Sequence, residues 1–146
     1  ITLEMARQAT EMKVGLTMFG HLWTDREGEY RGLFNIKLLG WAPLVMNIRI
    51  LAVNTGLTVT STLQRIAQLE RDRRLGAATA AELCEAYHLL TRHRIRLQIR
   101  QLRGEQNNSY FLDPASLAPA EQDELTRALA SIKDLQNVIR TNFSTM

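Results

Sequence analysis

A run of about 24 residues without glycine or proline, from Ala80 to Arg103, constrains the fold more than any other part of the chain. At 100° per residue its apolar side chains occupy two adjoining arcs, and arginines follow the remaining face. Thr79 and Glu82 form a capping-box pattern, which predicts that the helix begins at Ala80. A helix of this kind, about 36 Å long, packs against neighbours on two sides. The sequence therefore predicts a helical domain built around this segment.

Composition narrows the class of protein. With 146 residues, 45% apolar and 23% charged, the chain has the make-up of one soluble globular domain. A net charge of +3 is only mildly basic, which argues against a dedicated nucleic-acid binder. The single cysteine, Cys84, fits a reducing compartment, and the longest apolar run, residues 41–53, is too short to span a bilayer. We expect a cytoplasmic protein without membrane contact and, because it begins with Ile1, a fragment of a longer polypeptide.

The other segments complete the predicted fold. Helices are expected at residues 1–14, 41–54, 61–71 and 119–142, the third with a capping box at Ser61. Five glycines between Gly15 and Gly40 predict an extended, hairpin-like excursion whose second arm is residues 32–37, and residues 104–118 are expected to form a loop. The fold class is all-α: an antiparallel up-and-down four-helix bundle with an N-terminal helix and a Gly-rich excursion. Residues 1–14 are expected to be a connector from an upstream domain, and residues 15–146 the helical domain itself.

Several polar side chains fall at apolar positions of these helices. Arg94 lies at the centre of an apolar arc with Gln98 one turn later, and Arg49 lies between the apolar arcs of the 41–54 helix. Gln136 is the polar member of the stripe Leu125, Leu129, Ile132, Gln136, Ile139 and Phe143. A buried amide needs a partner, so we expect Gln136 to meet Arg94 or Gln98. Arg94 has two interpretations: a structural contact between helices, which is favoured, or a cation in a cleft that receives an anionic ligand.

Self-sufficient catalytic motifs are missing from the sequence. It has no phosphate-binding GxxxxGK[ST] loop, GxGxxG, HExxH or CxxC, and no Asp-x-Asp pair to hold Mg²⁺. His88 and His93 are five residues apart and diverge around their helix, so a zinc pair is not expected. We predict that the chain is not itself an enzyme and holds no metal.

Short motifs that occur in order along the chain resemble a known family. They are Met18-Phe19-Gly20, Phe34-Asn35-Ile36-Lys37, Arg49-x-x-Ala52-Val53, Ser61-Thr62-Leu63-Gln64-Arg65-Ile66, Arg94-Ile95-Arg96-Leu97-Gln98, Phe111-Leu112-Asp113-Pro114-x-Ser116-Leu117, Leu135-Gln136 and Phe143. Their order and spacing, over residues 14–143, resemble the C-terminal substrate-binding domain of bacterial nucleotidyltransferase-type signal-transduction proteins.

The resemblance implies a domain that presents an acceptor substrate to an upstream nucleotidyltransferase module. CBS or cyclic-nucleotide-binding sensor domains precede that module in the family, and Mg²⁺ and a nucleoside triphosphate belong to the module, so no cofactor is expected here. The implied substrate-binding residues are Lys37, Arg49, Arg65, Arg94 and Gln98, although helix–helix hydrogen bonding is favoured for Arg65 and Gln98. The acceptor is left open between a protein and a small molecule.

Two alternative functions remain at this stage. One is a helical dimerisation or regulatory module that relays sensor signals, which implies a homodimer. The other is nucleic-acid binding through Arg92, Arg96, Arg100 and Arg103. It is disfavoured because aromatic residues, on which bases stack, make up only 6% of the chain.

Overall fold

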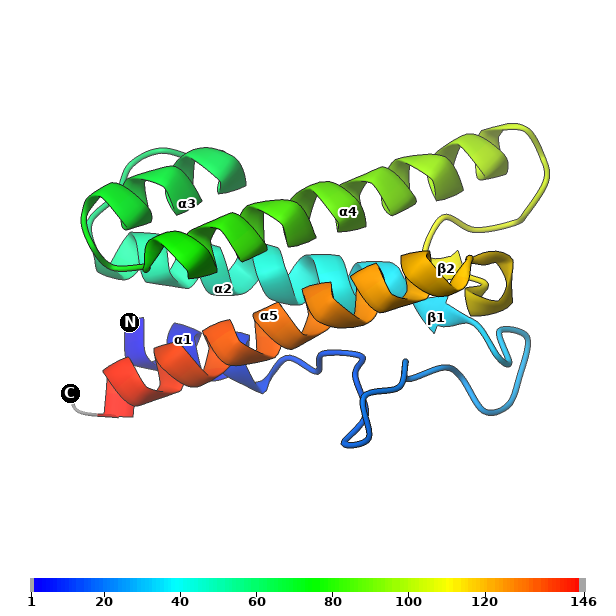
Figure 1. Cartoon of the computed structure of the whole chain (residues 1–146), viewed down its shortest axis with the longest axis horizontal. Coiled ribbons are helices and arrows are strands. Elements are labelled where there is room, and N and C mark those ends of the chain that lie inside the picture. Colours follow the sequence, from blue (N-terminus) through cyan, green and yellow to red (C-terminus); the bar gives the residue numbers. More distant parts are fainter. Residues whose placement is uncertain (1, 145–146) are drawn as a thin grey trace.

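The computed structural model describes residues 2–144 and is mostly helical (Figure 1). In chain order the elements are α1 (Thr2–Glu11), β1 (Phe34–Asn35), the π-helix η1 (Lys37–Trp41), α2 (Ala42–Asn54), α3 (Thr62–Arg71), α4 (Ala77–Leu102), β2 (Phe111–Leu112), the 3₁₀ helix η2 (Pro114–Ser116) and α5 (Pro119–Ser144). The predicted all-α class is confirmed. The finer up-and-down four-helix arrangement stays a prediction, as does the division at residue 14.

The core lies where the two longest helices, α4 and α5, run side by side, with α1 and α2 packed beneath α5 (Figure 1). The predicted stripe on α5 is confirmed, because all six of its members are buried. From α4 the core receives Leu83, Leu90 and Leu97. The α5 stripe alternates between spacings of four and three residues, and the three α4 leucines are seven residues apart, so the named side chains lie on one face of each helix.

The two predicted helix starts have different outcomes. Ser61 caps α3 as predicted, since its Oγ accepts a hydrogen bond from the Gln64 backbone N–H at 3.5 Å. The start predicted for α4 is wrong: α4 begins at Ala77, and Gly76 occupies the N-cap without a side-chain bond. The preceding link turns sharply because Arg73 has a left-handed φ of 57°, and Leu75 is buried. The buried Leu75 holds this turn against the core, and the helix therefore begins at Ala77, two residues before Thr79.

The expectation that α4 packs on two sides is confirmed: η1 lies against Leu90, Thr91 and Arg94, and α3 covers only the first half of the helix. There α3 contacts it on one side and α5 on the other (Figure 1). The ten-residue α3 is much shorter than the 26-residue α4. Beyond the reach of α3, the apolar side chains of Ile95, Ile99 and Leu102 are 50%, 41% and 87% exposed.

The glycine-rich excursion pairs differently from the prediction. Isolated bridges join Leu16 to Leu22 and Asp25 to Arg31 within it. Only the start of its expected second arm pairs back on the excursion, through backbone bonds of Gly32 and Leu33 to Asp25 at 2.7 and 3.0 Å. The next two residues, β1, instead form an antiparallel two-stranded sheet with β2. The segment predicted to be a loop at 104–118 therefore contains a strand and a 3₁₀ helix. This sheet fastens the start of η1 to the chain between α4 and α5.

Gln136 has another partner than the one predicted. Its Nε2 donates to the backbone carbonyls of Ala9 and Met12, at 3.3 and 2.9 Å. The Nδ2 of Asn47 also donates to the Ala9 carbonyl, at 3.0 Å. The last carbonyls of a helix have no partner within it, and α1 ends against α2 and α5. The two buried amides thus satisfy the end of α1, and the predicted bond to Arg94 or Gln98 is wrong.

Replacing Gly15 by Ala is expected to destabilise the fold. A Cβ atom at Gly15 would lie 2.8 Å from Leu39 Cβ and would also clash with the Phe34 ring. Overpacking of this kind costs about 1–3 kcal/mol, which urea denaturation would measure. As a control, Gly76→Ser enters open space at an N-cap and should change stability by less than about 0.5 kcal/mol. Equal stability of the Gly15→Ala variant and the wild type would contradict this account.

Stability is also expected to fall in mild acid because of His93. This side chain is buried and its Nε2 has no hydrogen-bond partner. Burial, followed by repulsion from Arg96 and Arg92, lowers the pKa of His93 below its usual 6.5. His93 therefore binds a proton more readily in the unfolded chain than in the folded one. The free energy of unfolding is highest above about pH 6.5, and it decreases as the pH falls below that value.

The test compares urea midpoints between pH 7.5 and pH 5 for the wild type, His93→Leu and His88→Leu. His88 is exposed, so its variant should keep the wild-type decrease, whereas His93→Leu should show a smaller one. The same pH dependence in all three proteins would exclude His93 as its source.

Candidate anion-binding site

The short sheet places Lys37 beside Tyr110. Phe34 pairs with Leu112 and Asn35 with Phe111, so the first residue of η1 meets the residue just before β2. The Nζ of Lys37 donates to the Tyr110 hydroxyl at 2.8 Å and lies 4.2 Å from the centroid of its ring. That hydrogen bond, followed by the Lys37 charge, lowers the pKa of the Tyr110 phenol, and the charge of Arg94 lowers it further. The pKa of the Tyr110 phenol thus responds to both Lys37 and Arg94.

Arg94 lies on the indole of Trp41. Its guanidinium carbon is 4.4 Å from the ring centroid, within the range of a cation–π contact. The Trp41 indole is itself held by α4, because Nε1 donates to Thr91 Oγ1 at 3.3 Å. The Nε of Arg94 is buried and has no hydrogen-bond partner. A buried donor without a partner carries a desolvation cost that an incoming acceptor would remove.

Neither cation has a carboxylate partner. The ion pairs within residues 2–144 are Arg7–Glu11, Arg96–Glu121 and Arg100–Glu105. Arg94 is partly buried over an aromatic ring, and a guanidinium in such a place prefers a carboxylate or phosphate. Lys37, Arg94, Trp41 and Tyr110 therefore form a candidate anion-binding site, called the cation site below.

The remaining predicted site residues lie elsewhere or play other roles. Arg65 donates from Nε to the Val59 carbonyl at 2.9 Å, which holds the link before α3 and is not the helix–helix bond that was expected. Arg49 is exposed on α2, so its predicted enclosure between apolar arcs is wrong. Gln98 is exposed one turn beyond Arg94 on α4. The structure thus brings Lys37 and Arg94 together, with Gln98 one turn away.

Trp41 and Tyr110 were missed from the sequence. Trp41 has the helical spacing of a core residue, and Tyr110 lies in a segment predicted to be a loop. The signal that was available is the Phe34–Lys37 and Phe111–Pro114 motif pair, whose members each begin a short strand. Pairing the two would have brought Lys37 next to Tyr110.

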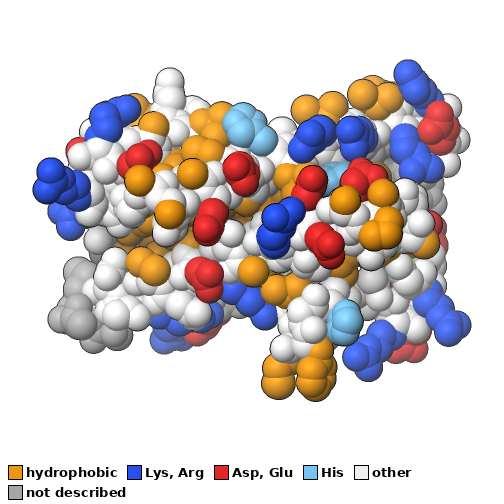
Figure 2. Space-filling model, viewed as in Figure 1, with side chains coloured by type: hydrophobic (Ala, Val, Ile, Leu, Met, Phe, Trp, Pro, Cys, Tyr) orange, Lys and Arg blue, Asp and Glu red, His pale blue; other side chains and the backbone are white. Residues whose placement is uncertain are grey.

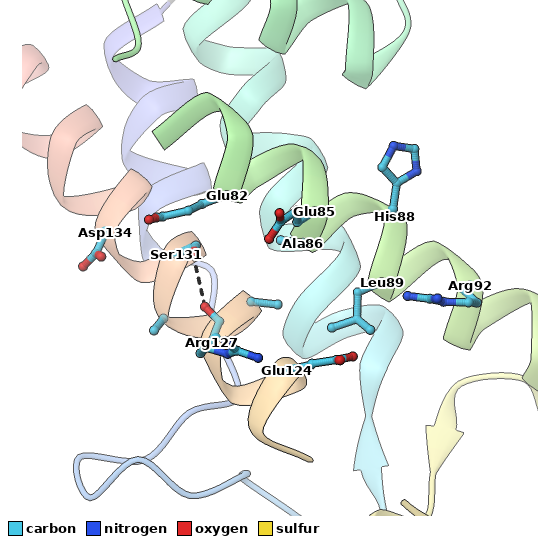
Figure 3. A pocket seen from close by; sticks show the side chains of 12 residues that line it. Glu82, Glu85, Ala86, His88, Leu89, Arg92, Glu124, Arg127, Ser131 and Asp134 are labelled. Atoms are coloured by element: carbon cyan, nitrogen blue, oxygen red, sulfur yellow. Dashed lines mark hydrogen bonds between the residues drawn. The ribbon is translucent and has the colours of Figure 1, made fainter. Parts of the chain in front are cut away.

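A hollow of about 730 Å³ lies between α4 and α5 (Figure 3). Its floor includes Ala86 and Leu89, and Ser131 Oγ donates to the Arg127 carbonyl at 3.1 Å at one wall. The charged side chains that line it are Glu82, Glu85, Glu124, Asp134, Arg92 and Arg127. Carboxylates outnumber arginines there, and no residue of the predicted site is among them. The hollow does not suit an anionic ligand.

Residues 2–144 offer neither a cluster of metal ligands nor a membrane-spanning helix. No group of three or more His, Cys, Asp and Glu side chains is placed to hold a metal ion. Within the same residues, no helix is both long and apolar enough to cross a membrane.

In structural class the chain is a mostly helical domain that carries two cations on aromatic rings. It belongs to the family described as "putative nucleotidyltransferase substrate binding domain", whose model matches residues 1–143. The family resemblance predicted from the motifs is confirmed at this level. No curated protein and no solved structure matches the chain.

Removing the Lys37 amine is expected to raise the pKa of Tyr110 back toward 10, because both its hydrogen bond and its charge favour the phenolate. Ultraviolet or NMR titration of Lys37→Met would measure the change. Arg94→Met should give a smaller rise and Arg49→Met none. A Tyr110 pKa that is the same in wild type and Lys37→Met would show that the two side chains are not in contact.

Proposed function

We propose that this domain is non-catalytic and presents an acceptor substrate to a nucleotidyltransferase module, holding an anionic group of that acceptor at the cation site. Membership of the family supports the link to nucleotidyl transfer. The observation that carries the proposal is Arg94, whose Nε is buried without a partner while its guanidinium lies on Trp41. An acceptor phosphate or carboxylate would supply the missing hydrogen bond and neutralise the charge.

The wider setting is part of the same proposal. The family resemblance suggests a bacterial, cytoplasmic parent protein with CBS or cyclic-nucleotide-binding sensor domains upstream. In that protein Mg²⁺ and the nucleoside triphosphate would be held by the nucleotidyltransferase module. The acceptor would be held at the edge of that module by Arg94, Lys37 and Gln98. These residues would position the acceptor and take no part in the chemical step.

Inorganic phosphate is the simplest probe of the cation site. NMR titration should shift the Trp41 indole and Tyr110 ring signals, and Arg94→Met and Lys37→Met should each weaken phosphate binding at least tenfold. Arg49→Met is the matched control, because Arg49 is an exposed cation away from the cation site, and it should stay within twofold. Equal phosphate affinity in Arg94→Met and the wild type would overturn the assignment of the site.

A second assay tests the lack of catalysis. The isolated chain, given Mg²⁺ and a radiolabelled nucleoside triphosphate, should transfer no nucleotide to itself or to added protein. Measurable transfer would show that the domain holds a catalytic centre, and the presenting role would then be wrong.

The second candidate function, a dimerisation or regulatory module, is favoured by one exposed feature. Met18 and Phe19 are 93% and 83% exposed at a turn that is closed by a 2.8 Å bond from the Thr17 N–H to the His21 carbonyl. Exposed apolar pairs on a rigid turn often mark association surfaces. Sedimentation of wild type and a Met18→Ser/Phe19→Ser variant would test it, and a monomeric wild type at high concentration would exclude it.

A further inference from the structure

Resting on the proposed function, we infer that the acceptor is a protein, and that it docks an acidic amphipathic helix on the half of α4 that α3 leaves uncovered. This surface, called the uncovered face, consists of Ile95, Gln98, Ile99 and Leu102. It begins one residue after Arg94, so a segment bound there also reaches the cation site.

The uncovered face continues a helix-binding face that α3 already uses. At 100° per residue, Ala80, Cys84 and Tyr87 of α4 lie on the same side as Ile95 and Leu102. In the first half, which α3 covers, Ala80 is buried and Cys84 and Tyr87 pack against the core as partly buried residues. In the second half the same side of the helix holds exposed Ile95 and Leu102. Both halves of α4 are thus apolar on this side, but only the first half is covered by another helix.

The neighbouring element offers a second wall. The π-helix η1 contacts α4, and its Leu38 side chain is 52% exposed. Lys37 and Trp41 flank Leu38 in η1 and belong to the cation site. From Ile95 to Leu102 the uncovered face runs about 11 Å, or two helical turns. A partner helix of three or four turns would lie along α4 with apolar side chains at i, i+3/i+4 and i+7.

Charge defines the polar side of the partner. Lys37 and Arg94 lie toward η1, and Arg92, Arg96, Arg100 and Arg103 follow the other side of α4. Glu105 pairs with Arg100 at 3.4 Å, and Glu121 lies 4.0 Å from Arg96. Figure 2 shows blue side chains, with some red ones among them, next to orange ones over the C-terminal half of α4. Cations outnumber carboxylates, so electrostatic complementarity selects an acidic partner.

The exposed side chains favour a protein helix over nucleic acid. Ile95, Ile99 and Leu102 are aliphatic and offer no ring on which a base would stack. Leucine and isoleucine on one helix face instead match the apolar stripe of another helix. Acidic flanks on that helix would then pair with Arg94, whose Nε lacks a partner.

The experiment uses two designed 18-residue helical peptides with the same leucine stripe, one flanked by glutamates and one by lysines. Fluorescence anisotropy of labelled peptide measures binding to the full 146-residue chain. The glutamate peptide should bind at least tenfold more tightly than the lysine peptide. Ile95→Glu and Leu102→Glu should each weaken it at least tenfold. Val138→Glu, on α5 and 41% exposed in the native chain, is the matched control and should stay within twofold.

Phosphate binding separates this inference from the proposed function. The Ile95→Glu variant should no longer bind the glutamate peptide, but its phosphate affinity should stay within threefold of the wild-type value. If the wild type binds phosphate but not the glutamate peptide, or binds both peptides equally, the helix-docking inference is wrong and the cation site stands. If the wild type does not bind phosphate, the proposed anion-binding role of the cation site is wrong, and the proposed function is overturned whatever the peptides do. Binding of phosphatidylserine vesicles or single-stranded RNA that Ile95→Glu abolishes, without peptide binding, would also overturn the inference.

Discussion

The close approach of η1 to the two long helices holds the rest of the structure in place. Gly40 is buried in η1, and a Cβ there would lie 3.2 Å from Leu90 of α4 and 3.4 Å from Leu129 of α5. Glycine lets the backbone of η1 sit this close to both helices, whereas a Cβ would have to displace the Leu90 side chain by a few tenths of an ångström. The contact fixes where Trp41 meets Arg94, and through the adjoining sheet it fixes where Lys37 meets Tyr110. The four side chains of the candidate site are thus positioned by packing in the core of the domain.

Charge is distributed unevenly along the α4–α5 surface. Acidic side chains surround the hollow at the N-terminal half of α4, and arginines gather at its C-terminal half (Figure 2). The net charge of +3 conceals this separation, because it sums the two regions. Ligand selection depends on the local potential, which a mildly basic total does not describe.

Helical periodicity predicted those parts of the structure in which each helix can be considered alone. The α5 stripe, the Ser61 cap and the burial of Leu83 and Leu90 follow from spacing along one helix. Apart from the start of α4, which is a local error, the errors concern how one segment meets another. Arg49 was expected to be enclosed although its helix has an open side, and Gln136 was assigned to α4 although the end of α1 needed donors. Likewise, Lys37 and Arg94 could be proposed from the sequence. The contact of Lys37 with Tyr110 depends on a strand pairing between distant residues, and that of Arg94 with Trp41 on the packing of η1 against α4.

The π-helical turn has a consequence for how this segment responds to a change in its length. The Ala42 N–H bonds to the Lys37 carbonyl, five residues back, so the turn contains one residue more than an ordinary α-helical turn. Deleting a residue from this segment would allow regular helix to continue. The same deletion would rotate everything before it by about 100° around the helix axis. The Lys37 amine would then move away from the Tyr110 phenol, so a change in chain length of one residue would break the hydrogen bond between them.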